Sequence, residues 1–218
     1  VIPDVAALIR ANPGTISLGQ GVVHYGPPVQ VFEAVSRFGG QISDHHYQAV
    51  AGLPLLREKL TDKLAIENNI SVGDEQVVLV TAGSNMAFSH VVMAIADPGD
   101  EIIIMSPYYF NHEMAITMAN CQPILVESDA EYQLVPEAIE AALTPRTRAV
   151  VTISPNNPTG AVYRQDALMA VNQLCRARGI YHLCDEAYEY FTYDGVSHFS
   201  PGSLRQSQAH TISFFSFS

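Results

Sequence analysis

The chain has 218 residues, 48% of them hydrophobic, and its 22 acidic against 11 basic side chains give a formal charge of −11. The acidic balance argues against nucleic-acid binding, because no basic patch is present to neutralise phosphates. No run of about 18 apolar residues occurs, so we expect no membrane span. Charged residues make up only 15% of the chain, against roughly 25% in a typical soluble domain, which predicts surface covered by a subunit interface or by further chain.

The opening Val1-Ile2-Pro3-Asp4 lacks the charged and apolar regions of a signal peptide. The three cysteines, Cys121, Cys175 and Cys184, are an odd number without CxxC spacing, so we interpret them as reduced, buried side chains of a cytoplasmic protein. The eight histidines show no HExxH or comparable spacing. We therefore predict no metal site and interpret them as surface or core residues.

The N-terminal part, residues 1–40, combines an extended Pro/Gly-rich opening with a helix near Val29–Phe38. We interpret it as an arm and linker that is part of a small domain. A polar turn and a helix at Pro54–Asn68 follow. From residue 76 onward, short β-branched runs alternate with amphipathic stretches, a pattern typical of βαβ units around a parallel sheet.

The expected strands of this sheet are Gln76–Thr81, Glu101–Ser106, Pro123–Glu127, Arg148–Ser154, Ile180–Cys184 and Thr211–Phe215. The expected helices between them are Ser84–Ile95, Asn111–Ala119, Pro136–Ala142 and Arg164–Arg178. Residues 41–218 are thus predicted to form an α/β domain of three layers, α/β/α, with a mostly parallel sheet. Its ligands are expected beyond the carboxyl ends of the strands.

Polar residues follow three of the expected strands. Gly83, Ser84 and Asn85 come after the first and open a helix, where free backbone amides and the helix dipole favour a phosphate. An ordinary helix cap is the plainer interpretation of this turn alone. After the strand that ends at Ser154, two prolines and a glycine form a turn that presents the Asn157 amide as a hydrogen-bond donor.

Asp185 lies at the end of another buried strand. A carboxylate there is costly unless it meets a cation, so Asp185 implies a positive partner such as a protonated ring nitrogen or a basic side chain. A strand-end cap or a structural ion pair is the alternative. Tyr188, three residues on, can reach the same ligand from a different angle.

Five short motifs occur in one characteristic order: AGSN (82–85), SPYY (106–109), SPNNPTG (154–160), DEAY (185–188) and SFS (216–218). In this order and spacing they resemble the class I/II aminotransferases, the pyridoxal-phosphate enzymes of fold type I. The segment from Leu18 to Gly21 and that from Tyr47 to Arg57 fit the same family. The resemblance therefore covers nearly the whole chain.

The resemblance implies a set of roles. Gly83, Ser84, Asn85 and Ser216 would bind the phosphate of pyridoxal phosphate. Tyr109 would stack on the pyridine ring, with Ala187 beneath it, and Asn157 and Tyr188 would hydrogen-bond the ring's 3′ oxygen. Asp185 would pair with the pyridinium nitrogen, so that the ring accepts electrons from the substrate. Gly21 and Asn157 would lie against the substrate, and Tyr47 would reach the neighbouring subunit's phosphate in a homodimer.

The family's Schiff-base lysine follows SFS, so we expect it directly after Ser218. The only lysines present, Lys59 and Lys63, lie on one upstream helix and match no such position. Three hypotheses explain why the sequence stops at Ser218. The next residue is a lysine that is no longer a standard residue because it carries covalently bound cofactor, or the chain is a fragment, or the protein is naturally short. We favour the first, because a stop at this one boundary is improbable by chance.

The function implied is an aminotransferase that moves an amino group from an amino acid to a 2-oxo acid by a ping-pong mechanism. A pyridoxal-phosphate lyase of the same fold, such as a carbon–sulfur β-lyase or an enzyme like aminocyclopropane-carboxylate synthase, shares every motif named. A sensing domain of a transcription regulator is the remote alternative. It would need a basic helix-turn-helix segment, which residues 1–40 do not show.

Overall fold

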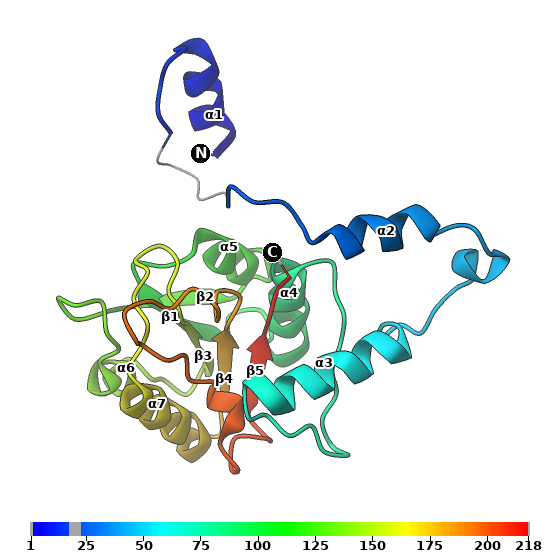
Figure 1. The fold of residues 1–218 in the computed structure, drawn as a ribbon. Helices are drawn as coiled ribbons and strands as arrows, with labels where there is room; N and C mark the ends of the chain where they lie inside the picture. The colour runs from blue at the N-terminus through cyan, green and yellow to red at the C-terminus, as the bar shows by residue number, and fades with distance from the viewer. Residues whose placement is uncertain (1, 18–22, 218) are drawn as a thin grey trace. The chain divides into compact units, whose positions relative to one another are not determined.

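The computed structural model describes residues 2–17 and 23–217 (Figure 1). The chain divides into two compact units, Val1–Tyr47 and Gln48–Ser218. The first contains helices α1 (Ile2–Ala11) and α2 (Val29–Arg37) and the 3-10 helix η1 (Ile42–His45). In α2, no side chain is buried within the described structure.

The sequence-based expectation of an extended opening is wrong for α1. This segment contains Ala6, Ala7, Leu8 and Ala11, residue types that favour helix. Asp4 in the first turn and Arg10 in the last turn interact favourably with the helix dipole. The Pro13-Gly14 pair that suggested an extended arm lies just beyond the end of the helix, where such residues are usual.

The second unit is built on a parallel sheet of five strands in the order β2-β1-β3-β4-β5. Its members are β1 (Glu101–Ser106), β2 (Gln122–Glu127), β3 (Thr147–Ile153), β4 (Tyr181–Asp185) and β5 (Thr211–Phe214). The chain leaves β1 toward β2 on one side and reaches β3 on the other. The crevice between β1 and β3 is therefore a topological switch point, where α/β sheets bind ligands.

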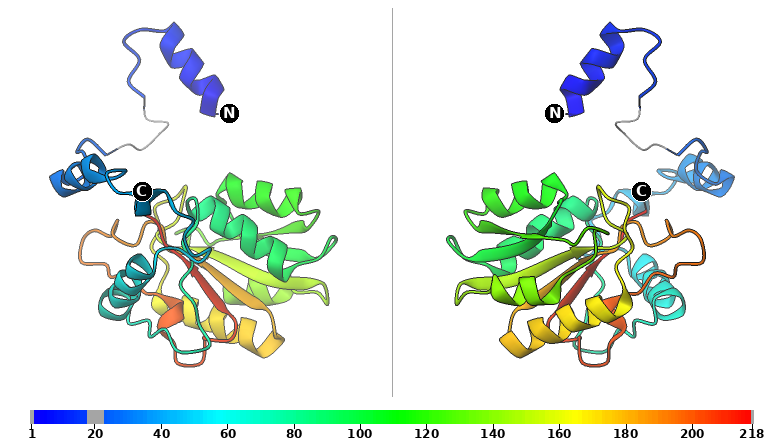
Figure 2. Two further views of the ribbon diagram at one scale, coloured as in Figure 1. Left: turned by 90° about the vertical axis from the view of Figure 1, so that its right-hand side faces the viewer. Right: turned by 90° about the vertical axis from the view of Figure 1, so that its left-hand side faces the viewer.

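Helices cover both faces of this sheet (Figure 2). The helices that pack on the strands are α4 (Ser84–Ile95), α5 (Phe110–Met118), α6 (Pro136–Ala141) and α7 (Gln165–Arg178), with the 3-10 helix η2 (Pro201–Ser203) against β5. The unit also contains α3 (Pro54–Glu67). Alternation along β1 separates two cores: Ile103 packs with α6 and α7, whereas Ile102 and Ile104 pack with α4 and α5. The predicted three-layer α/β fold is confirmed.

The expected elements of this unit agree with the observed ones to within one residue at each end, with one exception. The strand predicted over Gln76–Thr81 is absent: the segment carries no ladder, and Val77 and Leu79 are 58% and 61% exposed. Its β-branched alternation favours extended backbone, but a strand also needs a neighbour. Among the described residues, β5 pairs only with β4, and residues 76–81 meet no partner strand.

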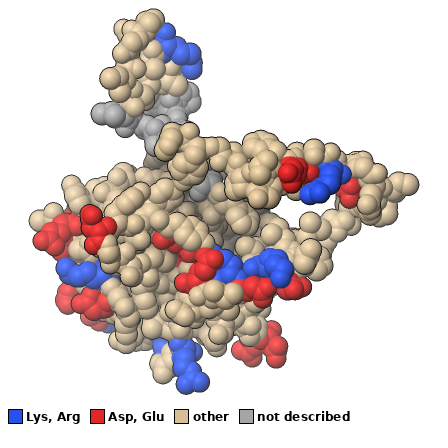
Figure 3. All heavy atoms as spheres, viewed as in Figure 1, with Lys and Arg blue, Asp and Glu red and all other residues tan. Residues whose placement is uncertain are grey.

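Acidic and basic side chains lie intermixed on the face shown in Figure 3, between wide uncharged areas. This matches the low charged fraction of the sequence. Cys121, Cys175 and Cys184 are free and buried, as predicted. No helix among the described residues is long and apolar enough to cross a membrane.

Candidate active site

A pocket of about 120 Å³ lies at the carboxyl ends of β3 and β4 and beside the first turn of α4. It brings together side chains from four separate stretches of the sequence, which the parallel pairing of the strands places at one edge of the sheet. The lining residues are Ser84, Asn85, Tyr109, Ile153, Asn157, Asp185, Ala187 and Tyr188. All but Ile153 were singled out from the sequence.

The first turn of α4 supplies backbone amides to this pocket. Gly83 precedes the helix with φ +86°, a conformation that costs a glycine little. The amides of the first turn of a helix have no partner within the helix, and the positive end of the helix dipole points toward the pocket. Ser84 and Asn85 therefore begin α4 in a place suited to an anionic group.

The loop after β3 separates a structural asparagine from a free one. Asn156 is buried, and its Oδ1 accepts hydrogen bonds from Thr159 N at 3.1 Å and Thr159 Oγ1 at 2.9 Å. Its Nδ2 donates to the hydroxyl of Tyr163 at 3.1 Å, and burial raises the pKa of Tyr163 to about 12. The Asn157 side chain makes no hydrogen bond within the described structure, so its amide is available to a ligand.

Asp185 is buried at the end of β4 and is paired with a histidine. Its Oδ2 lies 3.1 Å from Nε2 of His112, and its Oδ1 accepts a hydrogen bond from the backbone N of Ala187 at 3.1 Å. His112 stacks on Phe88, with ring centroids 4.0 Å apart and an interplanar angle of 21°. Both oxygens of Asp185 are thus fixed, which orients the carboxylate at the pocket wall.

The sequence did not identify His112 as a site residue. It lies in the first turn of α5, 73 positions before Asp185, and the absence of metal-ligand spacing favoured an ordinary core histidine. The signal that could have found it is the buried aspartate, for which the sequence predicted a positive partner, either a protonated ring nitrogen or a basic side chain, without naming a residue. Only the packing of α5 on the sheet shows which side chain it is.

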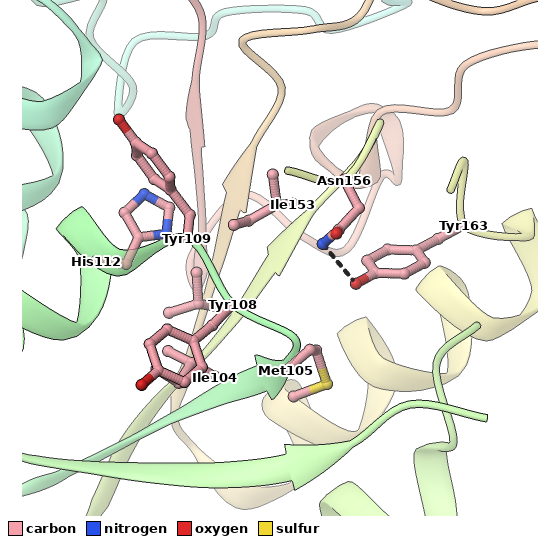
Figure 4. Close-up of a pocket in the computed structure, with 9 residues that line it drawn as sticks. Ile104, Met105, Tyr108, Tyr109, His112, Ile153, Asn156 and Tyr163 are labelled. Carbon is pink, nitrogen blue, oxygen red and sulfur yellow. Dashed lines mark hydrogen bonds between the residues drawn. The ribbon is translucent and has the colours of Figure 1, made fainter. Parts of the chain in front are cut away.

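Tyr109 lies between the pocket and a smaller cavity of about 10 Å³, and its hydroxyl accepts a hydrogen bond from Asn111 Nδ2 at 2.6 Å. Figure 4 shows Tyr109 and His112 side by side at the start of α5, opposite Ile153 and Asn156. The smaller cavity has room for about one water molecule, so it is no candidate for a cofactor.

The remaining predicted residues are distributed as follows. Ser216 follows β5 at the carboxyl edge of the same sheet and does not line the pocket. Tyr47 ends the first unit and has an exposed side chain. Gly21 lies outside the described residues. Within residues 2–17 and 23–217, no group of three or more His, Cys, Asp or Glu side chains is arranged to hold a metal ion.

Comparisons with known proteins agree on one family. The sequence model of the family "Aminotransferase class I and II" matches residues 13–218. An aspartate/prephenate aminotransferase of Thermus thermophilus is 39% identical over 207 residues, which are 94% of this chain and 52% of the relative. The aromatic aminotransferase ISS1 of Arabidopsis thaliana is 34% identical over an alignment of 223 positions, gaps included, that covers 100% of this chain and 55% of the relative.

Solved structures show the same likeness. The aspartate aminotransferase of Thermus thermophilus with maleate superposes with a TM-score of 0.89 at 36% identity, covering 97% of this chain and 55% of that one. An aromatic aminotransferase of Pyrococcus horikoshii gives a TM-score of 0.87 at 29% identity, covering 100% and 58%. The chain spans about half the length of the relatives it matches. On the motifs, the sheet and these matches, the chain belongs to the class I and II aminotransferases, a family that depends on pyridoxal phosphate.

Proposed function

We propose that this chain forms most of the cofactor site of an aminotransferase that passes an amino group from an amino acid to a 2-oxo acid. The observation that carries the proposal is the pairing of Asp185 with His112 at the wall of a pocket that Asn157 and Tyr188 also line. The names of the relatives, which include aspartate and aromatic aminotransferases, support transfer of nitrogen rather than elimination.

The residues of the pocket fit pyridoxal phosphate group by group. The first turn of α4, with Ser84 and Asn85, offers amides to a phosphate, and Ser216 is proposed to add a hydroxyl. The buried Asp185 carboxylate suits a protonated pyridine nitrogen, because a cation offsets its desolvation. Asn157 and Tyr188 can donate to a ring oxygen, and the flat face of Tyr109 suits stacking, with Ala187 on the other side.

Bound pyridoxal phosphate supplies an electron sink for the bond broken at the substrate Cα. The part of Asp185 is to keep a proton on the ring nitrogen, for which it must remain charged. His112 holds the Asp185 carboxylate in place through Oδ2, and the Ala187 amide does so through Oδ1. Asn157 and Tyr188 would orient the ring by hydrogen bonds to its 3′ oxygen.

The proposal extends to parts that the described pocket does not include. Residues 41–218 are proposed to be the large cofactor domain, and 1–40 an arm that belongs to a small domain. Tyr47 is proposed to reach the phosphate in the neighbouring subunit of a homodimer, and Gly21 to lie against the substrate carboxylate. Free, buried cysteines support a reducing compartment such as the cytoplasm.

The proposal is tested with the protein encoded by the complete reading frame, loaded with pyridoxal phosphate. It is incubated with aspartate, tyrosine or phenylalanine, each with and without 2-oxoglutarate. Transfer predicts glutamate formation that requires both partners and shows ping-pong kinetics. Asp97→Asn makes the same chemical change at an acidic position outside the pocket and is the control for Asp185→Asn.

The rival enzyme class gives a different result in the same experiment. A lyase would release ammonia and a 2-oxo acid from a single amino acid without an acceptor. Steady product formation in the absence of 2-oxoglutarate, with no glutamate in its presence, would therefore overturn the proposed transfer. Tight binding of a DNA fragment at low salt would instead favour a regulator.

A further inference from the structure

Two buried carboxylates lie in the turn that follows Asp185. Glu186 and Glu189 are 2% and 8% exposed, and the backbone N of Glu189 donates to Glu186 O at 3.0 Å. Neither carboxylate lines the pocket, yet Ala187 and Tyr188, which do, lie directly between them. Burial of two like charges so close together is costly unless each is paired or hydrogen-bonded.

A hydrogen-bond network joins these carboxylates to α3. Asn68, at the end of α3, donates through Nδ2 to Glu189 Oε2 at 2.6 Å and to Ser200 Oγ at 3.0 Å. The Ser200 hydroxyl then donates to Glu186 Oε2, which also lies 2.8 Å from Nε2 of His198. One amide thus connects both carboxylates to the same helix.

Lys63 is the basic side chain that forms an ion pair within this network. Its Nζ forms an ion pair with Glu189 Oε1 and donates to Asn68 Oδ1 at 2.8 Å. The ammonium also lies 4.6 Å from the ring centroid of Phe215, which directly precedes Ser216. Lys63 therefore contacts both the turn that carries Tyr188 and the end of β5, without reaching the pocket itself.

We propose that Lys63 is a positioning residue: by neutralising Glu189 it holds the 186–189 turn so that Tyr188 presents its hydroxyl to the cofactor. This inference rests on the proposed function for the identity of the ligand. The physical reason is that without the ammonium, the buried Glu189 carboxylate keeps the hydrogen bond from Asn68 but has lost the cation that pairs with its Oε1. The turn then has to move toward water to hydrate that carboxylate, and Tyr188 moves with it.

The test compares Lys63→Met with Tyr188→Phe in the complete, cofactor-loaded protein. The readout is the pH at which the visible absorption band of the bound cofactor titrates, because a hydrogen bond to the ring oxygen changes that pH. We expect Lys63→Met to shift the titration in the same direction as Tyr188→Phe, by about 0.5 pH unit or more. In the double variant, the Lys63 change should add little to the shift caused by Tyr188→Phe.

Lys59→Met is the matched control, since Lys59 lies on the same helix, is 63% exposed and pairs with Asp62 at 3.1 Å. It should leave the titration unchanged. Lys63→Met combined with Glu189→Gln removes both charges and should restore part of the shift. If Lys63→Met does not fold, Glu189→Gln alone weakens the pair from the turn's side, and a smaller shift in the same direction is expected.

A lower melting temperature without a shift of the titration, or shifts that add in the double variant, would show that Lys63 only stabilises the fold. If the protein takes up no cofactor, the proposed function fails. The anchoring of the 186–189 turn by Lys63 is then tested separately, by amide hydrogen exchange. Faster exchange of the Glu189 and Phe191 amides in Lys63→Met than in Lys59→Met, with β1 unchanged, supports the anchoring. Unchanged exchange in that turn overturns it.

Discussion

His112 Nε2 lies 3.1 Å from Asp185 Oδ2, and the two residues are 2% and 6% exposed. The contact joins the first turn of α5 to the end of β4. The Asp185 carboxylate is thus shielded from water and fixed in orientation. A group needs both properties to keep a ligand nitrogen protonated. His112 in turn stacks on the buried core residue Phe88. The orientation of the Asp185 carboxylate therefore depends on the packing of the core.

Replacing His112 with Ala should lower kcat by about tenfold or more while changing cofactor affinity only a few-fold. The reason is that the Asp185 side chain stays in the pocket wall but loses the partner that fixes its Oδ2. Steady-state kinetics and equilibrium cofactor binding measure the two quantities. His112→Gln, which can still donate, should recover part of kcat, and His90→Ala on the exposed side of α4 should change neither.

Asp185→Asn tests the role of the charge itself. Asn retains the shape and an acceptor for the Ala187 amide, so cofactor binding should be largely intact. The rate of Cα proton removal should fall by about 10² to 10⁴, because a neutral amide cannot hold the ring nitrogen protonated. Exchange of the substrate α-hydrogen with solvent, followed by NMR, measures this step. Turnover equal to that of the unmodified protein would show that Asp185 is not the partner of the ring nitrogen.

Gly83→Ala tests the anion site at the start of α4. At φ +86° and ψ 165°, a region that only glycine occupies readily, an alanine is strained by about 1–3 kcal/mol, and relief of that strain moves the first amides of the helix. We expect cofactor affinity to fall by about tenfold, measured by fluorescence titration. Gly195→Ala places an alanine at another positive φ, +78°, in a loop that does not line the pocket. It should lower stability without lowering affinity.

His182 predicts how stability depends on pH. Asn172 Nδ2 donates to its Nδ1 at 3.0 Å, so the remaining proton is on Nε2, which donates to Thr152 Oγ1 at 2.9 Å. Burial, followed by the neighbouring His210, lowers the pKa of His182 to about 3. Because the unfolded chain binds this proton near pH 6.5 and the folded chain does not, the stabilisation is complete above that pH. It is lost progressively as the pH falls toward 3.

Between pH 7.5 and pH 5, His182 alone should cost about 2 kcal/mol of the free energy of unfolding. Urea unfolding at the two pH values measures the difference. His182→Asn, which does not titrate, should lose about that much less over the same interval, whatever its stability at pH 7.5. An equal loss in both proteins would mean that His182 is protonated in the folded state.

The order of the elements could be predicted from the sequence because each signal is local. β-branched runs and amphipathic stretches set β1 to β5 and α4 to α7 within one residue. The segment Gln76–Thr81 shows the limit of that reasoning. Its pattern favours extended backbone, but a ladder depends on a neighbour that no local pattern contains.

For the site, too, some features could be predicted from the sequence and others only from the folded structure. Asp185, Asn157 and the Gly83 turn could be selected as candidates, because each places a polar group after an apolar run. Their roles came only from the order of the motifs, which resembles one family. Their meeting in one pocket follows from the parallel register of β3 with β4, which joins Ile153 to Asp185. The separation of Asn156, bound inside its loop, from the free Asn157 is likewise visible only in the folded loop.

The sequence by itself determined the fold class, the order of elements, the family and the cofactor chemistry, because these depend on local patterns and on motifs of fixed spacing. The tertiary structure decided which side chains support the site. His112 faces Asp185 across 73 positions, and Lys63 reaches Glu189 across 126. Neither pairing can be predicted from spacing, since each depends on how segments far apart in the sequence pack together and on the need to offset the charge of a buried carboxylate.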